Sequence, residues 1–504
     1  MKWKKEIPKA AAVGRRWKPF SILIALSLIF TSGCWKMGPD FQRPDSQSIV
    51  PVSFEQAQES ALAPNLDDPW WEDFSDPALT KIVEEALSNN LDIKRTTSRV
   101  LEVRSQFIQS RAARLPQLDV RGEVNKRRAD ITTGQRPSSQ RLTIDGYDLT
   151  LPASFEVDLW GRLARSEEAS RADLLQAEEN RRTIAQTVVA DTISLYFQIE
   201  SLERRIQITE DSIDTFGLSL KVAENRYRRG LRSVLDVRLA RRLLAQTEAV
   251  LPNLRQDLGV AQQRLAVLLG RYPTTRPPNR HPKDYFKKMA PVPAGIPSDI
   301  LKRRPDIRAS EASLKALNAR VGVAKASRFP RLALTGSLGY SSVELNDLFD
   351  PSSELRRIAM GLTQPLFDGG ELQARQRAAE ARYQQGLMNY ARNLLNAFAE
   401  VERALLSRKE QLERREKLLV FLSEARAAQE VAENRYLRGL ISYLNVLDAQ
   451  QSRFTAEQNV VAVDLSLLVN RVNLYRALGG GWGDPGPVEP GKDLYEINIK
   501  EYLL

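Results

Sequence analysis

The sequence predicts a mainly helical fold that arose by tandem duplication and carries two β-hairpins of the kind found in membrane barrels. The duplication is visible in VAENRYRRGL at 222–231 and VAENRYLRGL at 431–440, which agree at nine of ten positions. Proline is absent from 153–251 and from 366–484. Because proline costs about 3 kcal/mol inside a helix, long helices are expected in these two runs. A repeat of this length sets the architecture, since both copies should fold alike.

The spacing of the duplication changes once along the chain. Paired residues lie about 214 positions apart up to Gly122 and about 209 apart from Gly161 onward. A loop between these two glycines should therefore differ in length between the copies. The expected organisation is a first repeat at 79–270, a proline-rich linker at 271–299, a second repeat at 300–482 and a polar tail at 483–504.

The composition argues against an enzyme. The 504 residues include one histidine, His281, and one cysteine, Cys34. Metal sites and Ser-His or Cys-His nucleophile systems need imidazole or several thiolates, so we expect no cofactor and no metal. The net charge of +11 is assigned to arginine-rich solvated helix faces. No basic run carries interleaved aromatic residues, so no nucleic-acid partner is expected.

The N-terminus has the features of a targeting segment. A basic stretch precedes an apolar core at 20–30, which is too short for the roughly 20 residues that span a bilayer. The following Thr-Ser-Gly-Cys sequence is similar to the bacterial lipobox, in which the cysteine is acylated. We therefore expect a signal peptide at 1–33, lipidation of Cys34, and a leader at 34–78. The alternative is an ordinary signal peptide followed by an incidental cysteine.

Two long helices and their sharp turns follow from the duplicated segments. A continuous helix from Arg162 to Arg229 would be roughly 100 Å long, as in a coiled coil, a fibre or a tunnel wall. Gly230 and Gly439 can adopt the left-handed conformation that ends a helix. The serines that follow, Ser233 and Ser442, are candidate N-caps of the returning helices. The two turns should lie side by side.

Short stretches of alternating polar and apolar residues lie between the helices. They occur at 118–124 and 331–340 and predict hairpins at about 116–157 and 330–366. The polar segment 125–141 is expected to link the first pair of strands. Strands of about ten residues with one apolar face suit an outer-membrane barrel. The alternative is a soluble hairpin packed on helices.

The number of strands has a consequence for assembly. Two hairpins give four strands, whereas a closed membrane barrel needs at least about eight. Open sheet edges are not tolerated in lipid. If these strands lie in a membrane, several chains must share one barrel, and their long helices would line one tunnel.

The chain resembles the TolC-like outer-membrane factor family of bacterial efflux proteins, and more closely its lipidated OprM- and NodT-like branch. The resemblance covers nearly the whole mature chain. It rests on motifs in a fixed order: Cys34 followed by MGPDFQRP at 37–44, Trp70-Trp71, RRPDI at 303–307, QPLFDGG at 364–370, the two RY-x-RG-L-x-S turns, and LGGGW at 478–482.

The resemblance implies a homotrimer in the outer membrane, anchored by lipid and extending into the periplasm. Each subunit would give four strands to a twelve-stranded barrel that continues into a helical barrel. Such proteins are exit ducts of tripartite efflux pumps for small molecules, with a periplasmic adaptor and an inner-membrane transporter, here of the RND type. The alternatives are a duct for type I protein secretion and a periplasmic coiled-coil lipoprotein without a pore.

The resemblance also suggests site residues at the two helix turns. The adaptor would dock on Arg229, Gly230, Leu231, Ser233, Arg438, Gly439, Leu440 and Ser442. The pore gate would be formed by Asp448, Asn445, Tyr436 and Arg435. Asn445 stands where the family often has Asp, so one ring of charge would be lost. The alternative for each gate residue is ordinary helix packing or a solvated face.

Overall fold

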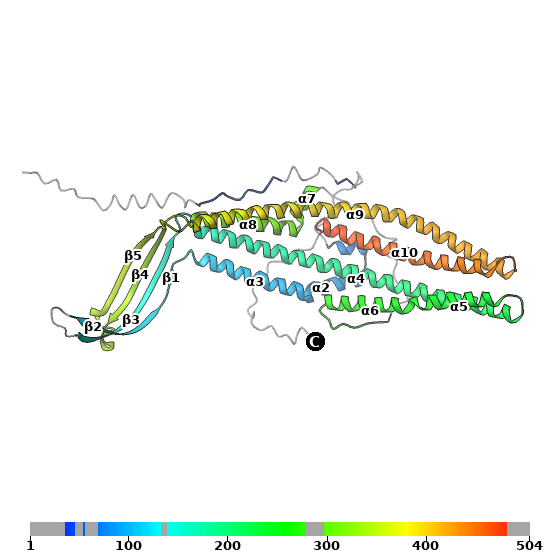
Figure 1. Ribbon diagram of the computed structural model, residues 1–504, viewed down its shortest axis with the longest axis horizontal. Helices are drawn as coiled ribbons and strands as arrows, with labels where there is room; N and C mark the ends of the chain where they lie inside the picture. Colours follow the sequence, from blue (N-terminus) through cyan, green and yellow to red (C-terminus); the bar gives the residue numbers. More distant parts are fainter. Residues whose placement is uncertain (1–35, 46–53, 56–68, 133–138, 278–296, 481–504) are drawn as a thin grey trace, which may run out of the picture. The chain divides into compact units, whose positions relative to one another are not determined.

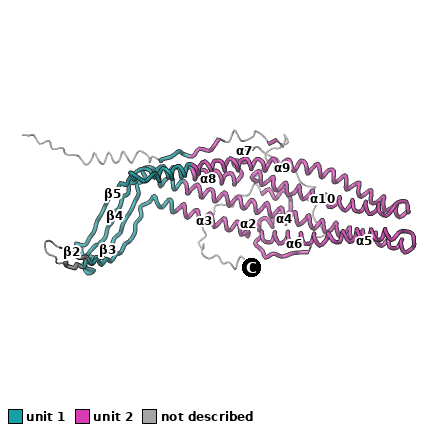
Figure 2. The backbone as a smooth tube through the Cα atoms, in the orientation of Figure 1, with its two compact units in different colours: residues 1–40, 109–168, 318–380 teal, residues 41–108, 169–317, 381–504 magenta. Residues whose placement is uncertain are grey.

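The computed structural model describes residues 36–45, 54–55, 69–132, 139–277 and 297–480. The expected signal peptide, the lipidation site Cys34, most of the linker and the polar tail lie outside the described residues. The chain forms two compact units (Figure 2), and each is considered by itself. Unit 1 comprises 1–40, 109–168 and 318–380, and unit 2 comprises 41–108, 169–317 and 381–504.

Helices dominate the chain (Figure 1). In order they are η1 (Trp70–Phe74), α2 (Pro77–Asn89), α3 (Leu91–Ala112), α4 (Arg162–Arg228), α5 (Val234–Glu248), α6 (Val250–Leu268), α7 (Pro297–Arg303), α8 (Pro305–Ala326), α9 (Glu371–Leu437) and α10 (Tyr443–Ala477). The duplicated helices α4 and α9 are each 67 residues long, about 100 Å at 1.5 Å per residue. Within the described residues, no helix is both long enough and apolar enough to cross a membrane.

The returning helices of the two copies differ. In the second copy α10 runs unbroken for 35 residues. In the first copy the return is divided into α5 and α6 at Ala249. Pro252 lies in the first turn of α6, where a missing backbone N–H is tolerated but a continuing helix would lose a hydrogen bond. Val461 occupies the corresponding position of α10, which explains why only one return is interrupted.

Unit 1 contains an antiparallel sheet. Its strands are β1 (Gln117–Leu118), β2 (Arg121–Thr132), β3 (Ser139–Val157), β4 (Arg331–Ser342) and β5 (Glu354–Thr363). Both β1 and β2 pair with β3, and the order then continues through β4 to β5. Among the described strands, β2 has only β3 as a neighbour and β5 has only β4. The sheet therefore has two open edges in one chain.

The first hairpin is longer than the sequence suggested. The segment 125–141 was expected to be a polar linker, but β2 and β3 stay paired through it as far as Thr132 and Ser139. Main-chain hydrogen bonds hold a two-stranded ladder whether or not its side chains are apolar. The expectation of a link there was therefore wrong. In the second copy β4 and β5 are joined by short 3₁₀ turns at Leu345–Asp347 and Pro351–Ser353.

Unit 2 has its main core where the early helices meet α10. Trp70 stacks on Tyr475 with ring centroids 4.8 Å apart, and Phe74 packs on Phe197 at 4.8 Å. Leu79, Leu394 and Val472 are fully buried around these rings and belong to the same cluster.

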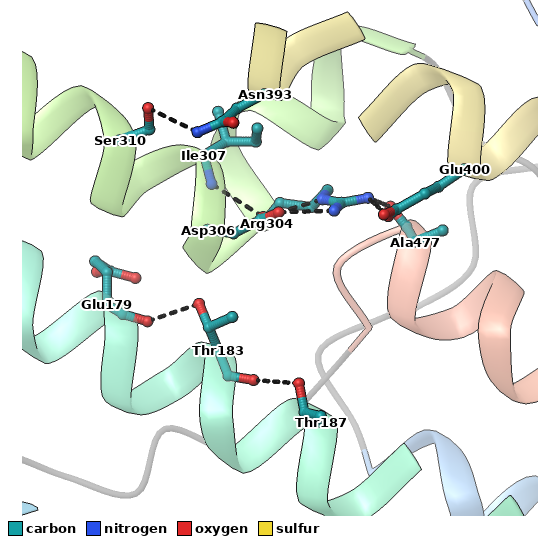
Figure 3. Close-up of polar contacts among 10 residues, drawn as sticks. All are labelled: Glu179, Thr183, Thr187, Arg304, Asp306, Ile307, Ser310, Asn393, Glu400 and Ala477. Atoms are coloured by element: carbon teal, nitrogen blue, oxygen red, sulfur yellow. Dashed lines mark hydrogen bonds and ion pairs between the residues drawn. The ribbon is translucent and has the colours of Figure 1, made fainter. Parts of the chain in front are cut away.

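A buried arginine joins three segments beside this core (Figure 3). Arg304 donates to Glu400 at 2.7 Å, to Asp306 at 2.7 Å and to the backbone oxygen of Ala477 at 3.1 Å. The Ala477 oxygen is one of the carbonyls that a helix C-terminus leaves without an intrahelical partner. Arg304 therefore fixes the junction between α7 and α8 against α9 and the end of α10.

Candidate functional site at the two helix turns

Both duplicated turns use glycine to reverse the chain. Gly230 and Gly439 have φ angles of 68° and 79°, a region that residues with a Cβ rarely adopt. The amide of Leu231 donates to the Arg226 carbonyl at 2.9 Å, and that of Leu440 donates to Arg435 at 3.0 Å. These 6→1 bonds close the ends of α4 and α9 as in a Schellman motif.

The two candidate N-cap serines behave differently. The Ser233 hydroxyl accepts a hydrogen bond from the Leu235 amide at 3.1 Å, which caps α5. Ser442 occupies the N-cap position of α10 but makes no side-chain cap bond. Its hydroxyl lies 3.2 Å from the Asn445 side-chain oxygen instead. Side-chain capping is therefore found at the first turn and not at the second.

Tyr436 and Tyr443 form the centre of a core between the two turns. Their ring centroids are 5.1 Å apart, and both residues are buried. Burial is the main reason that their hydroxyl pKa values are raised, that of Tyr443 to about 12. The surrounding cluster draws on both copies and includes Phe216, Ala223, Val237, Ala240, Leu243, Ala432, Val446, Leu447 and Ala449.

Arg226 connects the first turn to the second. Its guanidinium donates to the backbone oxygens of Tyr436 at 2.9 Å and Leu437 at 2.6 Å, and it lies 4.7 Å from the centre of the Tyr436 ring. Arg232 lies over the same ring at 5.5 Å. The two turns accordingly lie side by side (Figure 1). Sequence reasoning missed these two arginines, although Arg226 is the first-copy counterpart of Arg435.

The counterpart residues on the outer sides of the turns are exposed. Tyr227, which corresponds to Tyr436, is 47% exposed, whereas Tyr436 is 3% exposed. Arg435 is also exposed and lines a groove of about 850 Å³ between α9 and α10. The apolar residues that line this groove include Ala428, Val431, Ala432, Ile441 and Leu444.

The expected gate residues fall into two groups. Asp448, Asn445 and Arg435 are exposed and line the groove together, whereas Tyr436 lies in the buried core. All eight expected docking residues are exposed. Leu231 and Leu440, at the tips of the turns, are each 64% exposed. Across the described residues, no group of three or more His, Cys, Asp or Glu side chains is placed to hold a metal ion.

Comparison with known proteins identifies the family. The outer membrane efflux protein family matches residues 82–271 and 296–480, one match for each repeat. The chain therefore belongs to this family of outer-membrane efflux proteins.

Individual relatives align over nearly their whole length. The probable outer membrane lipoprotein SilC of Salmonella typhimurium is 32% identical over 91% of this chain and 98% of its own. The toluene efflux pump outer membrane protein TtgI of Pseudomonas putida is 32% identical over 92% and 98%. The solved structure of the outer-membrane channel OprN superposes with a TM-score of 0.82 at 30% identity, covering 89% of this chain and 100% of that one.

Proposed function

We propose that this protein is the outer-membrane exit duct of a tripartite efflux pump, formed by three identical chains. Each chain would supply its strands to a shared twelve-stranded barrel and its long helices to the wall of a tunnel. A periplasmic adaptor and an inner-membrane transporter of the RND type would complete the pump and provide the energy. Small molecules would leave passively through the duct.

The observation that best supports this proposal is the sheet of unit 1. One face of the sheet is apolar, and the strands of unit 1 do not cover it. Strand register places Leu332 opposite both Val157 and Leu362, and Leu334 opposite both Phe155 and Met360. The large apolar side chains exposed on this side of the sheet are Leu118, Val120, Val124, Leu149, Leu151, Leu334, Leu338, Ile358, Met360 and Leu362. A lipid-facing surface accounts for this exposure.

The dimensions of the apolar face suit an outer membrane. From Leu332 to Tyr340 the β4 strand advances about 27 Å, which a tilt of about 40° reduces to roughly 21 Å, near the ~25 Å apolar band of such barrels. Aromatic pairs flank it, with Trp160 against Phe329 at 4.9 Å and Tyr340 against Phe349 at 5.6 Å. Aromatic side chains are enriched at both membrane–water boundaries.

The open edges of the sheet favour several chains in one barrel. A sheet edge cannot face lipid, because its unpaired backbone groups would lack hydrogen-bond partners. The β2 and β5 edges of different chains would pair and close the barrel.

The duplicated helix turns favour the same arrangement. In a ring where first-copy and second-copy hairpins alternate, each hairpin has two neighbours. On one side a first-copy hairpin contacts the second-copy hairpin of its own chain, and on the other side it contacts the second-copy hairpin of the adjacent chain. Arg226 makes the contact within the chain, on Tyr436. Its counterpart Arg435 would make the contact between chains, on Tyr227 of the next chain. The first-copy hairpin of that chain would then fill the groove that Arg435 lines.

The remaining site assignments belong to this proposal. Cys34 would carry the lipid anchor in the outer membrane. The turn residues around Gly230 and Gly439 would bind the adaptor, and Asp448 would form a ring of three carboxylates that disfavours anions at the closed entrance. Because one relative is named for toluene efflux and another for cation efflux, we assign substrate choice to the inner-membrane transporter.

Planar bilayer recording tests the duct. The purified protein should give single-channel currents, and Asp448→Ala should raise conductance and weaken cation preference. A protein that passes no current in any variant would contradict the duct and favour a coiled-coil lipoprotein without a pore. Gly439→Asp tests docking separately: it should abolish co-purification with the adaptor while the purified protein keeps its channel activity.

A further inference from the structure

Unit 1 contains a buried arginine whose partners are mostly in the leader. The Arg165 side chain is only 2% exposed. It donates to the backbone oxygens of Met37 and Gly38, each at 3.1 Å, and to the Asp40 carboxylate at 2.8 Å. Its fourth hydrogen bond goes to Glu168, one turn along α4, at 2.8 Å. Three of these four hydrogen bonds therefore depend on the segment Met37–Asp40.

Both repeats contribute to the surface that holds this segment. From the first repeat, the Trp160 carbonyl accepts a hydrogen bond from the Met37 amide at 3.0 Å. From the second repeat, the buried Asn318 amide group in α8 donates to the Pro39 carbonyl at 2.9 Å. The leader thus joins the start of α4 to α8 through Trp160 and Asn318, which are more than 150 positions apart in the sequence.

Glycine permits a close backbone approach at this surface. A Cβ on Gly322, about one turn before the end of α8, would lie 2.9 Å from the Met37 oxygen and 3.0 Å from the Cγ of Arg165. A Cβ on Gly38 would lie 2.7 Å from the Gly322 Cα. Glycine in a helix interior is unfavourable relative to alanine, so its use here needs a packing reason. The docked leader supplies that reason.

We propose that the segment Met37–Asp40 is a latch. Arg165 of the first repeat and Gly322 of the second hold this segment, and so fix the start of the mature chain beside the inner end of the apolar strands. A buried guanidinium is costly unless it is paired and hydrogen-bonded, so undocking would leave Arg165 with one partner of four. The Asp40 carboxylate is 88% exposed, and an exposed ion pair contributes little. The backbone oxygens of Met37 and Gly38 are therefore the main partners.

The latch also limits how far a lipid attached to Cys34 can lie from Met37. Three peptide units span at most about 11 Å. Met37 is bonded to Trp160, which together with Phe329 marks the inner boundary of the apolar face. A lipid on Cys34 would therefore be tethered at the membrane boundary. The latch itself does not depend on that lipid.

Cleavage of the Lys36–Met37 bond by trypsin reports undocking. The full-length protein in detergent is treated with trypsin, and chains that begin at Met37 are quantified by mass spectrometry. Arg165→Met should raise the cleavage rate at this bond about tenfold or more, since cleavage follows the open population and a charge-assisted hydrogen bond in a buried site is lost. Arg162→Met is the matched control, because Arg162 lies in the same turn of α4 and pairs with Glu156 instead.

Gly322→Ala separates the latch from a general effect on folding. Helix propensity alone predicts a more stable α8 and unchanged or slower cleavage, whereas the latch predicts faster cleavage. Gly217→Ala in α4 is its control, because a Cβ there meets no atom within 4 Å. Wild-type cleavage rates in both Arg165→Met and Gly322→Ala would overturn the proposal, as would equal acceleration in the two controls. The cleavage rate is read without any channel assay, so failure of the duct proposal would not affect it.

Discussion

The first and second helix turns have nearly the same sequence but different surroundings. Tyr436 is buried in a core between the turns, and Tyr227 of the first copy is 47% exposed. Arg226 binds the backbone of the second turn, whereas Arg435 lines an open groove. The same residues thus form a core on one side and an exposed surface on the other. In the proposed trimer, a neighbouring chain would cover the exposed side and repeat the contact that Arg226 makes within one chain.

Removal of the Tyr436 ring or the Tyr227 ring should have the largest effects on stability, and the two effects should differ most from each other. Tyr436→Ala leaves a cavity in a buried cluster and should cost about 3–5 kcal/mol. Tyr227→Ala should leave the fold of a chain intact and weaken association between chains. Thermal melting by circular dichroism measures the first effect, and the melting of the oligomer on gels measures the second. Equal effects of the two variants on both measurements would remove the proposed distinction.

The two arginines provide the next comparison. Arg226→Met removes two hydrogen bonds to carbonyls at the end of α9, which should cost about 2 kcal/mol in this partly buried position. Arg435→Met should cost a chain little and should lower the thermal resistance of the oligomer. Both variants are read by the same melts. Loss of chain stability in Arg435→Met alone would show that the assignment of inner and outer contacts is reversed.

The serines should give a smaller difference. Ser233→Ala removes the cap of α5 and should lower stability by about 1 kcal/mol. Ser442→Ala should cost clearly less, because this hydroxyl makes no cap bond. Denaturant titration of the two variants is the measurement. A larger loss in Ser442→Ala than in Ser233→Ala would contradict the capping geometry.

The smallest effect on stability is expected from Asn445→Asp, which restores the residue type found at Asp236 in the first copy. A carboxylate in the first turn of α10 should stabilise the helix by about 0.3–1 kcal/mol. In the proposed trimer it would also add a second ring of negative charge near Asp448. Reversal potentials in a salt gradient should therefore shift toward cation selectivity. An unchanged reversal potential would place Asn445 away from the ion path.

Much of the helical architecture could be predicted from the sequence. The predicted helix from Arg162 to Arg229 is α4, which ends at Arg228, and both turn glycines have the expected left-handed conformation. Proline-free length and glycine position are local signals, and local signals are the ones that a single sequence carries.

The environments of these elements could not be predicted in the same way. Tyr227 and Tyr436 occupy equivalent sequence positions, so only their neighbours in space decide which one is buried. The strand pairing through 125–141 depends on main-chain bonds that leave little trace in the side-chain pattern. The burial of Arg165 depends on contacts with a leader more than 120 positions away in the sequence.

Native mass spectrometry of the protein purified in detergent tests most directly whether one chain's open sheet is completed by other chains. The account predicts a complex with the mass of three chains. A stable single chain, with its apolar strand face and both sheet edges left to detergent, would contradict it.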